Sequence, residues 1–291
     1  MKSNYKIRLV ENGIFPIVKN HNGEVLKDLP ATGQDFPGTI QGEGKLIGIP
    51  VLFVRTAGCN LRCLWEMPDG TVSACDTPYS SFDLQGSGYF DIRYVLDTIA
   101  QNLGHIQHVV ISGGEPMLQN KALIELCRLL KLELKVHISI ESNATIFDDD
   151  LAYYVDFFSL SPKLKGSVPN TAKLEKLNLS GLENYSLLHE KRRMNIKIIQ
   201  QFIDLRKKAY VPDYDFQLKF VVSSKDEEQE IKAILRKLTA WKNSDIVLMP
   251  VGVSGNELKS STKLCWTMAV RNGWRFTPRL HIDLFGDKSG V

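Results

Sequence analysis

Three cysteines that lie close together in the sequence have the residue type and spacing of a metal-cluster site. Three residues separate Cys59 from Cys63, and eleven separate Cys63 from Cys75, within TAGCNLRCLWEMPDGTVSACDTPYSS. Three thiolates can hold a [4Fe–4S] cluster by three of its irons and leave the fourth iron open for a ligand. Zinc is the rival metal, but it prefers four closed ligands with shorter cysteine pairs, and no fourth Cys or His stands at such a spacing. Three structural thiols in one loop are the remaining alternative.

The other two cysteines are predicted to be core thiols. Five cysteines are an odd number in a long chain, which favours ligands or buried thiols over a disulfide framework. Cys127 and Cys265 stand in ALIELCRLLKL and KLCWTMAV, where apolar residues recur at helical spacing. Neither has a partner nearby in the sequence.

Glycine-rich and polar motifs directly follow several strand-like runs. They are ISGGEP (111–116), IESNAT (140–145), SPK (161–163) and MPVG (249–252). Glycines at a strand end let a ligand approach the backbone closely. Because α/β barrels build their sites at the carboxyl ends of parallel strands, we expect these motifs and the cysteine loop to surround one site.

The elements that must position these motifs follow an alternating pattern. Six nearly continuous apolar runs predict strands buried on both faces, at 51–56, 108–112, 135–141, 157–161, 216–222 and 245–251. Helices are predicted between most of them, at 91–103, 119–132, 148–154, 225–241 and 256–271. Such alternation indicates an α/β fold with a parallel sheet and right-handed crossovers.

Three segments lie outside this pattern. IRLVENGIFPIV predicts a hairpin about Asn12-Gly13, within an N-terminal extension of residues 1–36. PRLHIDLF (278–285) predicts an added C-terminal strand. Residues 164–214 predict a helical elaboration inside one domain that spans 1–291, because the strand pattern resumes after it. Its basic groups at 191–193 and 206–208 favour a solvated helix face over a nucleic-acid surface.

Composition excludes several classes of protein. The 291 residues are 43% hydrophobic and 24% charged, which excludes a disordered or collagen-like chain. The net charge of +3, from 36 basic and 33 acidic residues, is too balanced to indicate a nucleic-acid partner. The longest apolar run, 47–54, is far shorter than the ~20 residues of a membrane-spanning helix. The first residues lack an apolar signal core, so we expect a cytoplasmic protein without a membrane partner.

The motifs in combination resemble a known group of enzymes. The Cys-x3-Cys pair with a third cysteine, and Gly-Gly-Glu-Pro after the next strand, resemble the radical S-adenosylmethionine superfamily. GTIQGEGKLIGIPVLFVRTAGCNLRC (38–63), CDT (75–77), SPK, LKFVV and RLHIDLFG further resemble the 7-carboxy-7-deazaguanine synthase family, over about 36–291 except 164–214. The resemblance implies a partial TIM-like barrel of six β/α units, elaborated, with an N-terminal extension and an extra C-terminal strand.

The resemblance also implies a reaction. The cluster would cleave S-adenosylmethionine reductively to a 5′-deoxyadenosyl radical, which takes hydrogen from carbon 6 of 6-carboxy-5,6,7,8-tetrahydropterin. Ring contraction and loss of ammonia would give 7-carboxy-7-deazaguanine, a lyase reaction of 7-deazapurine (queuosine-type) biosynthesis. Mg²⁺ beside the substrate carboxylate, a flavodoxin-like electron donor and a homodimer are implied as well. The cofactors supply this chemistry, while the protein binds and orients.

Site residues follow from the matched motifs. The resemblance assigns Cys59, Cys63 and Cys75 to the cluster, and Thr77 to Mg²⁺, which prefers hard oxygen ligands. An N-cap or turn hydroxyl is the alternative for Thr77. The residues assigned to S-adenosylmethionine are Ala74, Asp76, Gly113, Gly114, Glu115, Glu141, Ser142, Ser161, Pro162 and Lys163. Those assigned to the pterin are Ile40, Gln41, Gly42, Glu43, Arg55, Ser112 and His281.

Physical arguments support some of these assignments and leave alternatives for others. Amide and carboxylate side chains such as Gln41 and Glu43 pair with the donor and acceptor edge of a guanine-like ring. A guanidinium such as Arg55 binds a carboxylate by two parallel hydrogen bonds. An ordinary strand-end ion pair is the alternative for Arg55, and a packed strand histidine is the alternative for His281.

One departure from the family pattern lies inside the cysteine loop. The family spacing leaves two residues between the second and third cysteines, so nine residues, EMPDGTVSA (66–74), are extra here. Pro68, Asp69 and Gly70 predict a turn, hence a looped excursion after Trp65. Whether Trp65 or Ala74 lies near the adenine stays open.

Two rival functions remain. A glycyl-radical-enzyme activase of the same superfamily would not need TIQGEG and CDT. A non-catalytic iron–sulfur or zinc module would leave SGGEP and SPK at the strand ends unexplained.

Overall fold

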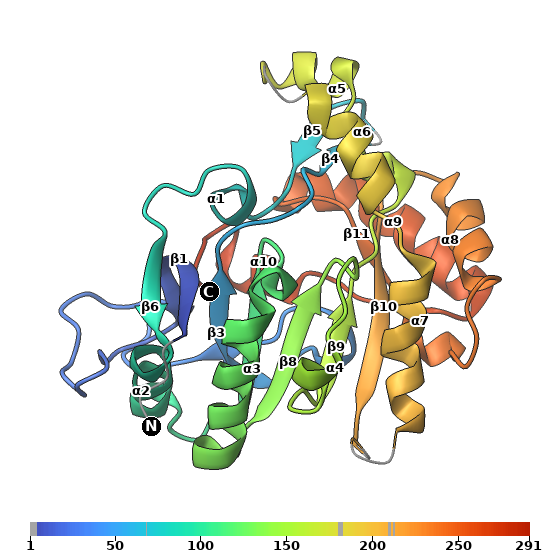
Figure 1. The fold of residues 1–291 in the computed structure, drawn as a ribbon. Coiled ribbons are helices and arrows are strands. Elements are labelled where there is room, and N and C mark those ends of the chain that lie inside the picture. Colours follow the sequence, from blue (N-terminus) through green and yellow to red (C-terminus); the bar gives the residue numbers. More distant parts are fainter. Residues whose placement is uncertain (1–4, 68, 180–182, 209–210, 212) are drawn as a thin grey trace.

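A ten-stranded mixed sheet organises the chain (Figure 1). The structure is a computed structural model that describes residues 5–67, 69–179, 183–208, 211 and 213–291. The strands follow the order β12-β11-β10-β9-β8-β7-β3-β1-β6, with β2 (Thr39–Ile40) paired to β3 off this path. A separate two-stranded sheet consists of β4 (Leu64–Glu66) and β5 (Val72–Ala74).

Six parallel strands form the centre of the large sheet. They are β3 (Pro50–Thr56), β7 (His108–Gly113), β8 (His137–Ser142), β9 (Phe157–Leu160), β10 (Asp215–Val222) and β11 (Ile246–Pro250). Each pairs in parallel with the next along the chain, which confirms the predicted strands and the α/β class. The sheet is open, because β12 and β6 form its two opposite edges and do not pair with each other. No closed barrel forms among the described residues.

Helices follow most of these strands. The longer ones are α2 (Ile92–Asn102), α3 (Asn120–Leu129), α8 (Glu227–Leu235) and α9 (Gly255–Asn272). Single turns are α1 (Pro78–Ser81), α4 (Asp149–Ala152), η1 (Gly44–Leu46), η2 (Pro116–Gln119), η4 (Lys165–Ser167), η5 (Leu205–Lys207) and η6 (Asn243–Asp245). A π-helical turn, η3 (Leu130–Leu134), extends α3. The predicted helices are therefore present, although α4 and α8 are shorter than expected.

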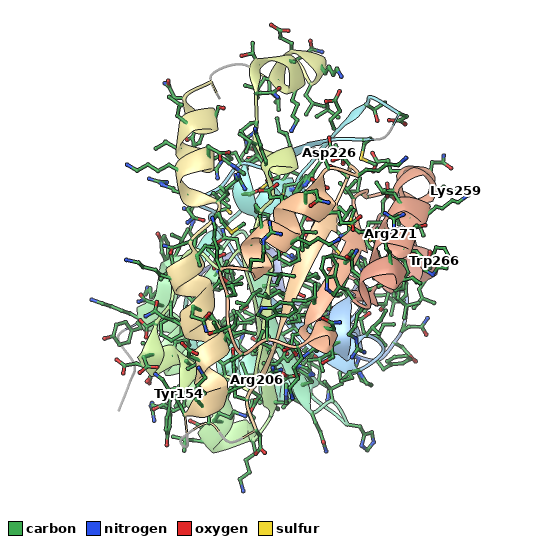
Figure 2. All side chains as sticks on the ribbon, turned by 90° about the vertical axis from the view of Figure 1, so that its right-hand side faces the viewer. Tyr154, Arg206, Asp226, Lys259, Trp266 and Arg271 are labelled. Atoms are coloured by element: carbon green, nitrogen blue, oxygen red, sulfur yellow. The ribbon has the colours of Figure 1, made fainter. Side chains whose placement is uncertain are left out.

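The core lies between the sheet and these helices. Phe158 of β9, and Phe216 and Phe220 of β10, are fully buried. Cys127 and Cys265 have no exposed surface either, which confirms that they are core thiols. On the outer side of α9, Lys259 and Trp266 point away from the body of the protein (Figure 2). Among the described residues, no helix combines the length and the apolarity needed to cross a bilayer.

The N-terminal hairpin prediction is wrong. Residues Lys6–Phe15 form one strand, β1, which pairs antiparallel with both β3 and β6 (Gly88–Asp91). The Asn-Gly pair instead forms an irregularity within the strand: Asn12 has a φ of 52°, and the register with β3 shifts between Leu9 and Ile14. A bulge accommodates the turn residues without reversing the chain. Part of the predicted extension thus belongs to the central sheet.

The prediction of a strand at 278–285 is also wrong. The added strand is the short β12 (Arg275–Phe276), parallel to β11, and residues Leu280–Phe285 form the helix α10. The N–H of Leu280 donates to the carbonyl of Gly42 at 3.0 Å. This contact turns the segment across the carboxyl ends of the strands, so that it does not lengthen the sheet.

Among its described residues, the elaboration between β9 and β10 contains three α-helices besides the single turns η4 and η5. They are α5 (Thr171–Lys176), α6 (Glu183–Arg192) and α7 (Ile196–Asp204). Helix α7 packs on the sheet through Ile199, Phe202 and Ile203, whereas α5 and α6 lie beside the β4–β5 hairpin, at the top of Figure 1. Two arginines of its basic groups are engaged in ion pairs: Arg193 with Glu190 and Glu230, and Arg206 with Asp215 and Asp245.

Candidate active site

A cavity of about 590 Å³ opens at the carboxyl ends of the parallel strands. Every residue assigned to the cluster, to Mg²⁺, to S-adenosylmethionine or to the pterin lines it, except Glu115 and Pro162. The expectation that the strand-end motifs and the cysteine loop meet at one site is therefore met geometrically. Additional lining residues include Trp65, Tyr79, Asn143, Lys219 and Arg279.

The nine extra residues, predicted to be a looped excursion with a turn, belong to an antiparallel hairpin. Leu64 pairs with Ala74 and Glu66 with Val72. The N–H of Cys75 donates to the carbonyl of Cys63 at 3.2 Å, so the hairpin begins and ends between these two cysteines. Pro68, part of the predicted turn, lies outside the described residues. Trp65 and Ala74 both line the cavity, which leaves both as neighbours of a bound ligand.

The three thiols of the loop are free, and their surroundings fit a metal cluster. Burial raises the pKa of Cys59 to about 11 and also raises the pKa of Cys63 and Cys75, so the unmetallated thiols are protonated. Coordination to a metal removes that proton. Among the described residues, no three His, Cys, Asp or Glu side chains surround a point where one metal ion could bind. Cluster thiolates bind separate irons, so they need not converge on one point.

The glycines after β7 bring the backbone close to the cysteine loop. A Cβ atom on Gly113 would clash with Thr56, and one on Gly114 would clash with the carbonyl of Gly58. Glycine is therefore required for this approach. The wall of the cavity here consists of backbone, which leaves room for a ligand.

Glu115 lies behind this wall. It has no exposed surface, and its carboxylate accepts hydrogen bonds from Met117 N (3.0 Å), Ser142 Oγ (2.9 Å) and Asn143 N (2.7 Å). Its position holds the end of β8 against the loop after β7. The contact with S-adenosylmethionine expected from the resemblance is not available to its side chain in this structure.

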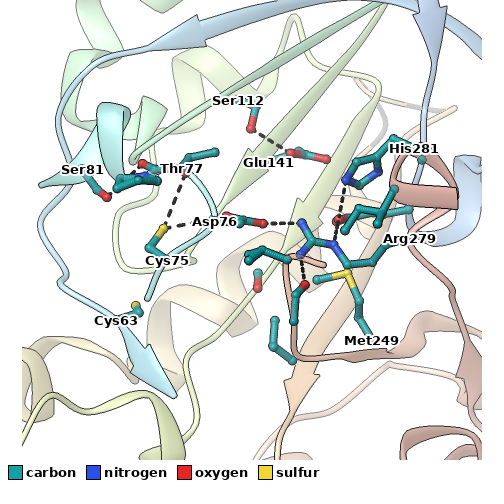
Figure 3. A pocket seen from close by; sticks show the side chains of 18 of the residues that line it. Cys63, Cys75, Asp76, Thr77, Ser81, Ser112, Glu141, Met249, Arg279 and His281 are labelled. Atoms are coloured by element: carbon teal, nitrogen blue, oxygen red, sulfur yellow. Dashed lines mark hydrogen bonds and ion pairs between the residues drawn. The ribbon is translucent and has the colours of Figure 1, made fainter. Parts of the chain in front are cut away.

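Ion pairs join Glu43, Asp76 and Arg279, which come from three separate segments of the cavity wall (Figure 3). Lys219 Nζ donates to Glu43 Oε2 at 2.5 Å, and Arg279 Nε donates to Glu43 Oε1 at 2.9 Å. Arg279 also pairs with Asp76, which follows Cys75, and donates to the carbonyl of Gly252 at 2.5 Å. Burial alone would raise the pKa of Glu43, but the charges of Lys219 and Arg279 outweigh it and lower that pKa. Glu43 is therefore ionised.

Lys219 and Arg279 are functional candidates that the sequence analysis missed. The signal for Lys219 was a lysine inside the apolar run FQLKFVV, since a lysine is almost never fully buried unless it is paired. Arg279 stands two residues before His281 in RLH, a spacing that places both side chains on one face of the predicted strand, and this signal was overlooked.

Glu141 connects residues from the two predicted binding sets. Its carboxylate accepts hydrogen bonds from Ser112 Oγ at 2.8 Å and from Gln41 Nε2 at 3.2 Å. Both donors were assigned to the pterin, whereas Glu141 was assigned to S-adenosylmethionine. His281 Nε2 lies 4.0 Å from Glu43 Oε1, and burial lowers the pKa of His281, so its ring is neutral at pH 7. These groups form a continuous polar surface.

Arg55 has no carboxylate partner among the described residues. Its guanidinium carbon lies 5.3 Å from the ring centre of Phe15 and 6.0 Å from that of Tyr79. Its buried Nε has no hydrogen-bond partner. The strand-end ion pair is thus not formed, and two aromatic faces hold the guanidinium at the cavity.

Thr77 precedes α1 but its side chain makes no capping hydrogen bond. Its Oγ1 lies 3.5 Å from Cys75 Sγ and lines the cavity. The N-cap alternative is therefore not formed, whereas the contact with Cys75, two residues away, corresponds to the turn alternative.

Comparison with known proteins identifies the family. A model described as "4Fe-4S single cluster domain" matches residues 40–188. The 7-carboxy-7-deazaguanine synthase of Halobacterium salinarum is 36% identical over 256 residues, which cover 86% of this chain and 88% of that protein. The chain belongs to the 7-carboxy-7-deazaguanine synthase family.

Further 7-carboxy-7-deazaguanine synthases support this membership. That of Rhodopirellula baltica is 33% identical and covers 86% of this chain and 85% of its own. That of Bacillus subtilis is 31% identical and covers 88% of this chain and 96% of its own. The crystal structure of QueE from Escherichia coli has the same fold, with a TM-score of 0.56 at 21% identity over 92% of this chain and 95% of that one. The recognition made from the motifs is confirmed, and neither rival function is favoured.

Proposed function

We propose that this chain converts 6-carboxy-5,6,7,8-tetrahydropterin to 7-carboxy-7-deazaguanine with loss of ammonia, as a radical S-adenosylmethionine lyase of 7-deazapurine biosynthesis. The observation that carries the proposal is the meeting of three free thiols, a glycine-lined wall and an unpaired guanidinium in one cavity. When bound, the [4Fe–4S] cluster and S-adenosylmethionine supply the radical that removes hydrogen from carbon 6 of the pterin.

The cofactor half of the cavity is the part near the cysteine loop. Cys59, Cys63 and Cys75 would hold the cluster, and the backbone of Gly113 and Gly114 would lie against the methionine portion of S-adenosylmethionine. The remaining contacts would come from Ala74, Asp76, Ser142, Ser161 and Lys163, which share the same wall. Lys163 Nζ donates to Ser161 Oγ at 2.8 Å, so these two side chains are already oriented together.

The substrate half is the part near the buried charges. Gln41, Glu43 and Glu141 present amide and carboxylate groups that match the donor and acceptor edge of a pterin. Ile40, Gly42, Ser112 and His281 complete this wall. Because Glu141 accepts hydrogen bonds from Ser112 and Gln41, we assign it to the pterin as well as to S-adenosylmethionine. The assignment of Glu115 becomes one of support for the wall.

The carboxylate of the substrate would lie at Arg55. The guanidinium lacks a partner and is held by aromatic faces, so an entering carboxylate would neutralise it without displacing another anion. Mg²⁺ would bind the same carboxylate from the side of Thr77, whose hydroxyl is not used in capping.

We further propose that the six parallel strands represent a partial barrel, and that residues 1–291 form one domain. The partial barrel is supported by the order of β3, β7, β8, β9, β10 and β11, which are neighbours in the sheet in the same order as in the chain. A homodimer in the cytoplasm, reduced by a flavodoxin-like donor and without nucleic-acid or membrane partners, completes the proposal.

Anaerobic reconstitution tests the function. The protein is given iron and sulfide, then dithionite, S-adenosylmethionine and the carboxytetrahydropterin, and the products are analysed by mass spectrometry. We expect 7-carboxy-7-deazaguanine from the unmodified chain and from Cys127→Ala, but none from Cys75→Ala. Cleavage of S-adenosylmethionine without this product would contradict the proposed substrate.

A further inference from the structure

The two parts of the chain that depart from the family pattern pack against each other. Lys173 of α5 donates to the carbonyl of Leu64 in β4 at 2.8 Å and also to two carbonyls of its own segment, Gly166 and Val168. Lys176 donates to Glu66 Oε1 at 2.8 Å and to the carbonyl of Gly70 at 2.9 Å. The helical elaboration is therefore docked on the extra hairpin, directly beside the cysteine loop.

Helix α6 of the elaboration carries one side chain that reaches a cysteine of the loop. His189 is 1% exposed, and its Nε2 lies 3.3 Å from Cys63 Sγ. Its other ring nitrogen, Nδ1, is buried without a hydrogen-bond partner. Among the described residues, the only polar contact of the imidazole is thus the one with the sulfur of Cys63.

We propose that His189 is a positioning residue for the cluster, donating its Nε2–H to the sulfur of Cys63. The proposal rests on the proposed function, because it takes Cys63 as a cluster ligand. An iron-bound thiolate carries no proton, so the hydrogen of this contact belongs to the imidazole. The Nδ1 lone pair is then the group left without a partner, and a lone pair is less costly to leave unpaired than an N–H.

The physical effect of this hydrogen bond is on the reduction of the cluster. Reduction adds negative charge, part of which lies on the ligand sulfurs, and a donor at a sulfur stabilises the reduced form more than the oxidised form. Hydrogen bonds to the sulfurs are among the factors that set cluster potentials. The elaboration would therefore make the cluster easier to reduce, and it would fix the orientation of Cys63.

The test compares two substitutions of similar length. His189→Gln keeps an N–H donor, and His189→Met does not. Leu187→Ala, in the same helix at a residue that is 80% exposed, controls for changes to α6 itself. Each protein is reconstituted anaerobically, its iron content is measured, and its midpoint potential is determined by titration followed by electron paramagnetic resonance, without pterin.

We expect His189→Met to retain iron and to be about tenfold harder to reduce, a shift of about 59 mV to lower potential for one electron. His189→Gln and Leu187→Ala should remain close to the unmodified protein. Retention of iron by the glutamine variant together with its loss from the methionine variant would also support the proposal, because only the donor differs.

Equal potentials in the methionine variant and the unmodified protein would overturn the proposal. Loss of iron from both histidine variants, with Leu187→Ala intact, would also overturn it, since the ring would then act as a ligand or as packing. Absence of a cluster from the unmodified protein would overturn it together with the proposed function. A cluster with the expected potential shifts, but without turnover of the pterin, would count against the proposed substrate alone.

Discussion

Arg279 forms an ion pair with Asp76, and this contact links the C-terminal segment to the residue that follows Cys75. The same guanidinium donates from Nε to Glu43 at 2.9 Å. One buried side chain therefore ties the predicted pterin loop to the cysteine loop. Arg279 therefore fixes the position of the predicted substrate half of the cavity relative to the predicted cofactor half.

Removal of this arginine is expected to destabilise the protein. Arg279→Ala leaves the buried carboxylate of Glu43 with only Lys219 and leaves Asp76 unpaired, and breaking such a pair costs about 3–5 kcal/mol in the free energy of unfolding. Arg279→Lys should recover part of this loss, because it restores a charge but not the planar fork. Urea denaturation of the metal-free protein measures the effect. Arg275→Ala, at an exposed residue of β12, should change stability by less than about 0.5 kcal/mol. An Arg279→Ala protein as stable as the control would refute the structural role.

Deletion of residues 66–74 is expected to leave cluster assembly intact. The backbones of Cys63 and Cys75 already meet at the base of the hairpin, with N and O 3.2 Å apart, so Leu64 and Trp65 can connect them directly. The lost contacts of Lys176 with Glu66 and Gly70 are exposed and contribute about 0–1 kcal/mol. Iron content after reconstitution is the measurement, with Lys176→Ala as the matched control. A folded deletion variant without any iron would show that the hairpin itself shapes the site.

Substitutions at Arg55 and Thr77 are expected to affect the pterin step and not S-adenosylmethionine binding. Loss of a buried charge contact costs about 2–5 kcal/mol, so Arg55→Ala should lower kcat/KM for the pterin by tenfold or much more. Arg55→Lys should restore little, since an ammonium cannot form the fork. Thr77→Ala should weaken the dependence of turnover on Mg²⁺. Steady-state kinetics at several Mg²⁺ concentrations, with S-adenosylmethionine binding measured separately, check these outcomes.

Two results would contradict these assignments. One is normal turnover of Thr77→Ala with an unchanged Mg²⁺ requirement. The other is an Arg55→Ala protein that loses S-adenosylmethionine binding while it keeps its affinity for the pterin.

Local patterns were sufficient to predict the six central strands and the turn in the cysteine loop, because both depend on neighbouring residues. Continuous apolar runs identified the six central strands, and Asp69-Gly70 identified the turn between β4 and β5. The error at Asn12-Gly13 arose because the same residue pair can form a bulge as readily as a turn, and pairing with β3 and β6 decides between them.

The buried charges could not be predicted in this way. Lys219 and Arg279 meet Glu43 across separations of 176 and 236 positions in the chain. No periodicity connects residues so far apart. The inward orientation of Glu115 could not be predicted either, because its partners Ser142 and Asn143 lie at the end of a different strand, β8.

The fate of one hydrogen atom tests the proposed chemistry most directly. Carboxytetrahydropterin carrying deuterium at carbon 6 is incubated with the reduced, reconstituted protein and S-adenosylmethionine, and the 5′-deoxyadenosine formed is analysed by mass spectrometry. The proposed function predicts 5′-deoxyadenosine heavier by one deuterium, together with 7-carboxy-7-deazaguanine. Unlabelled 5′-deoxyadenosine alongside that product, or no change in the pterin at all, would contradict it.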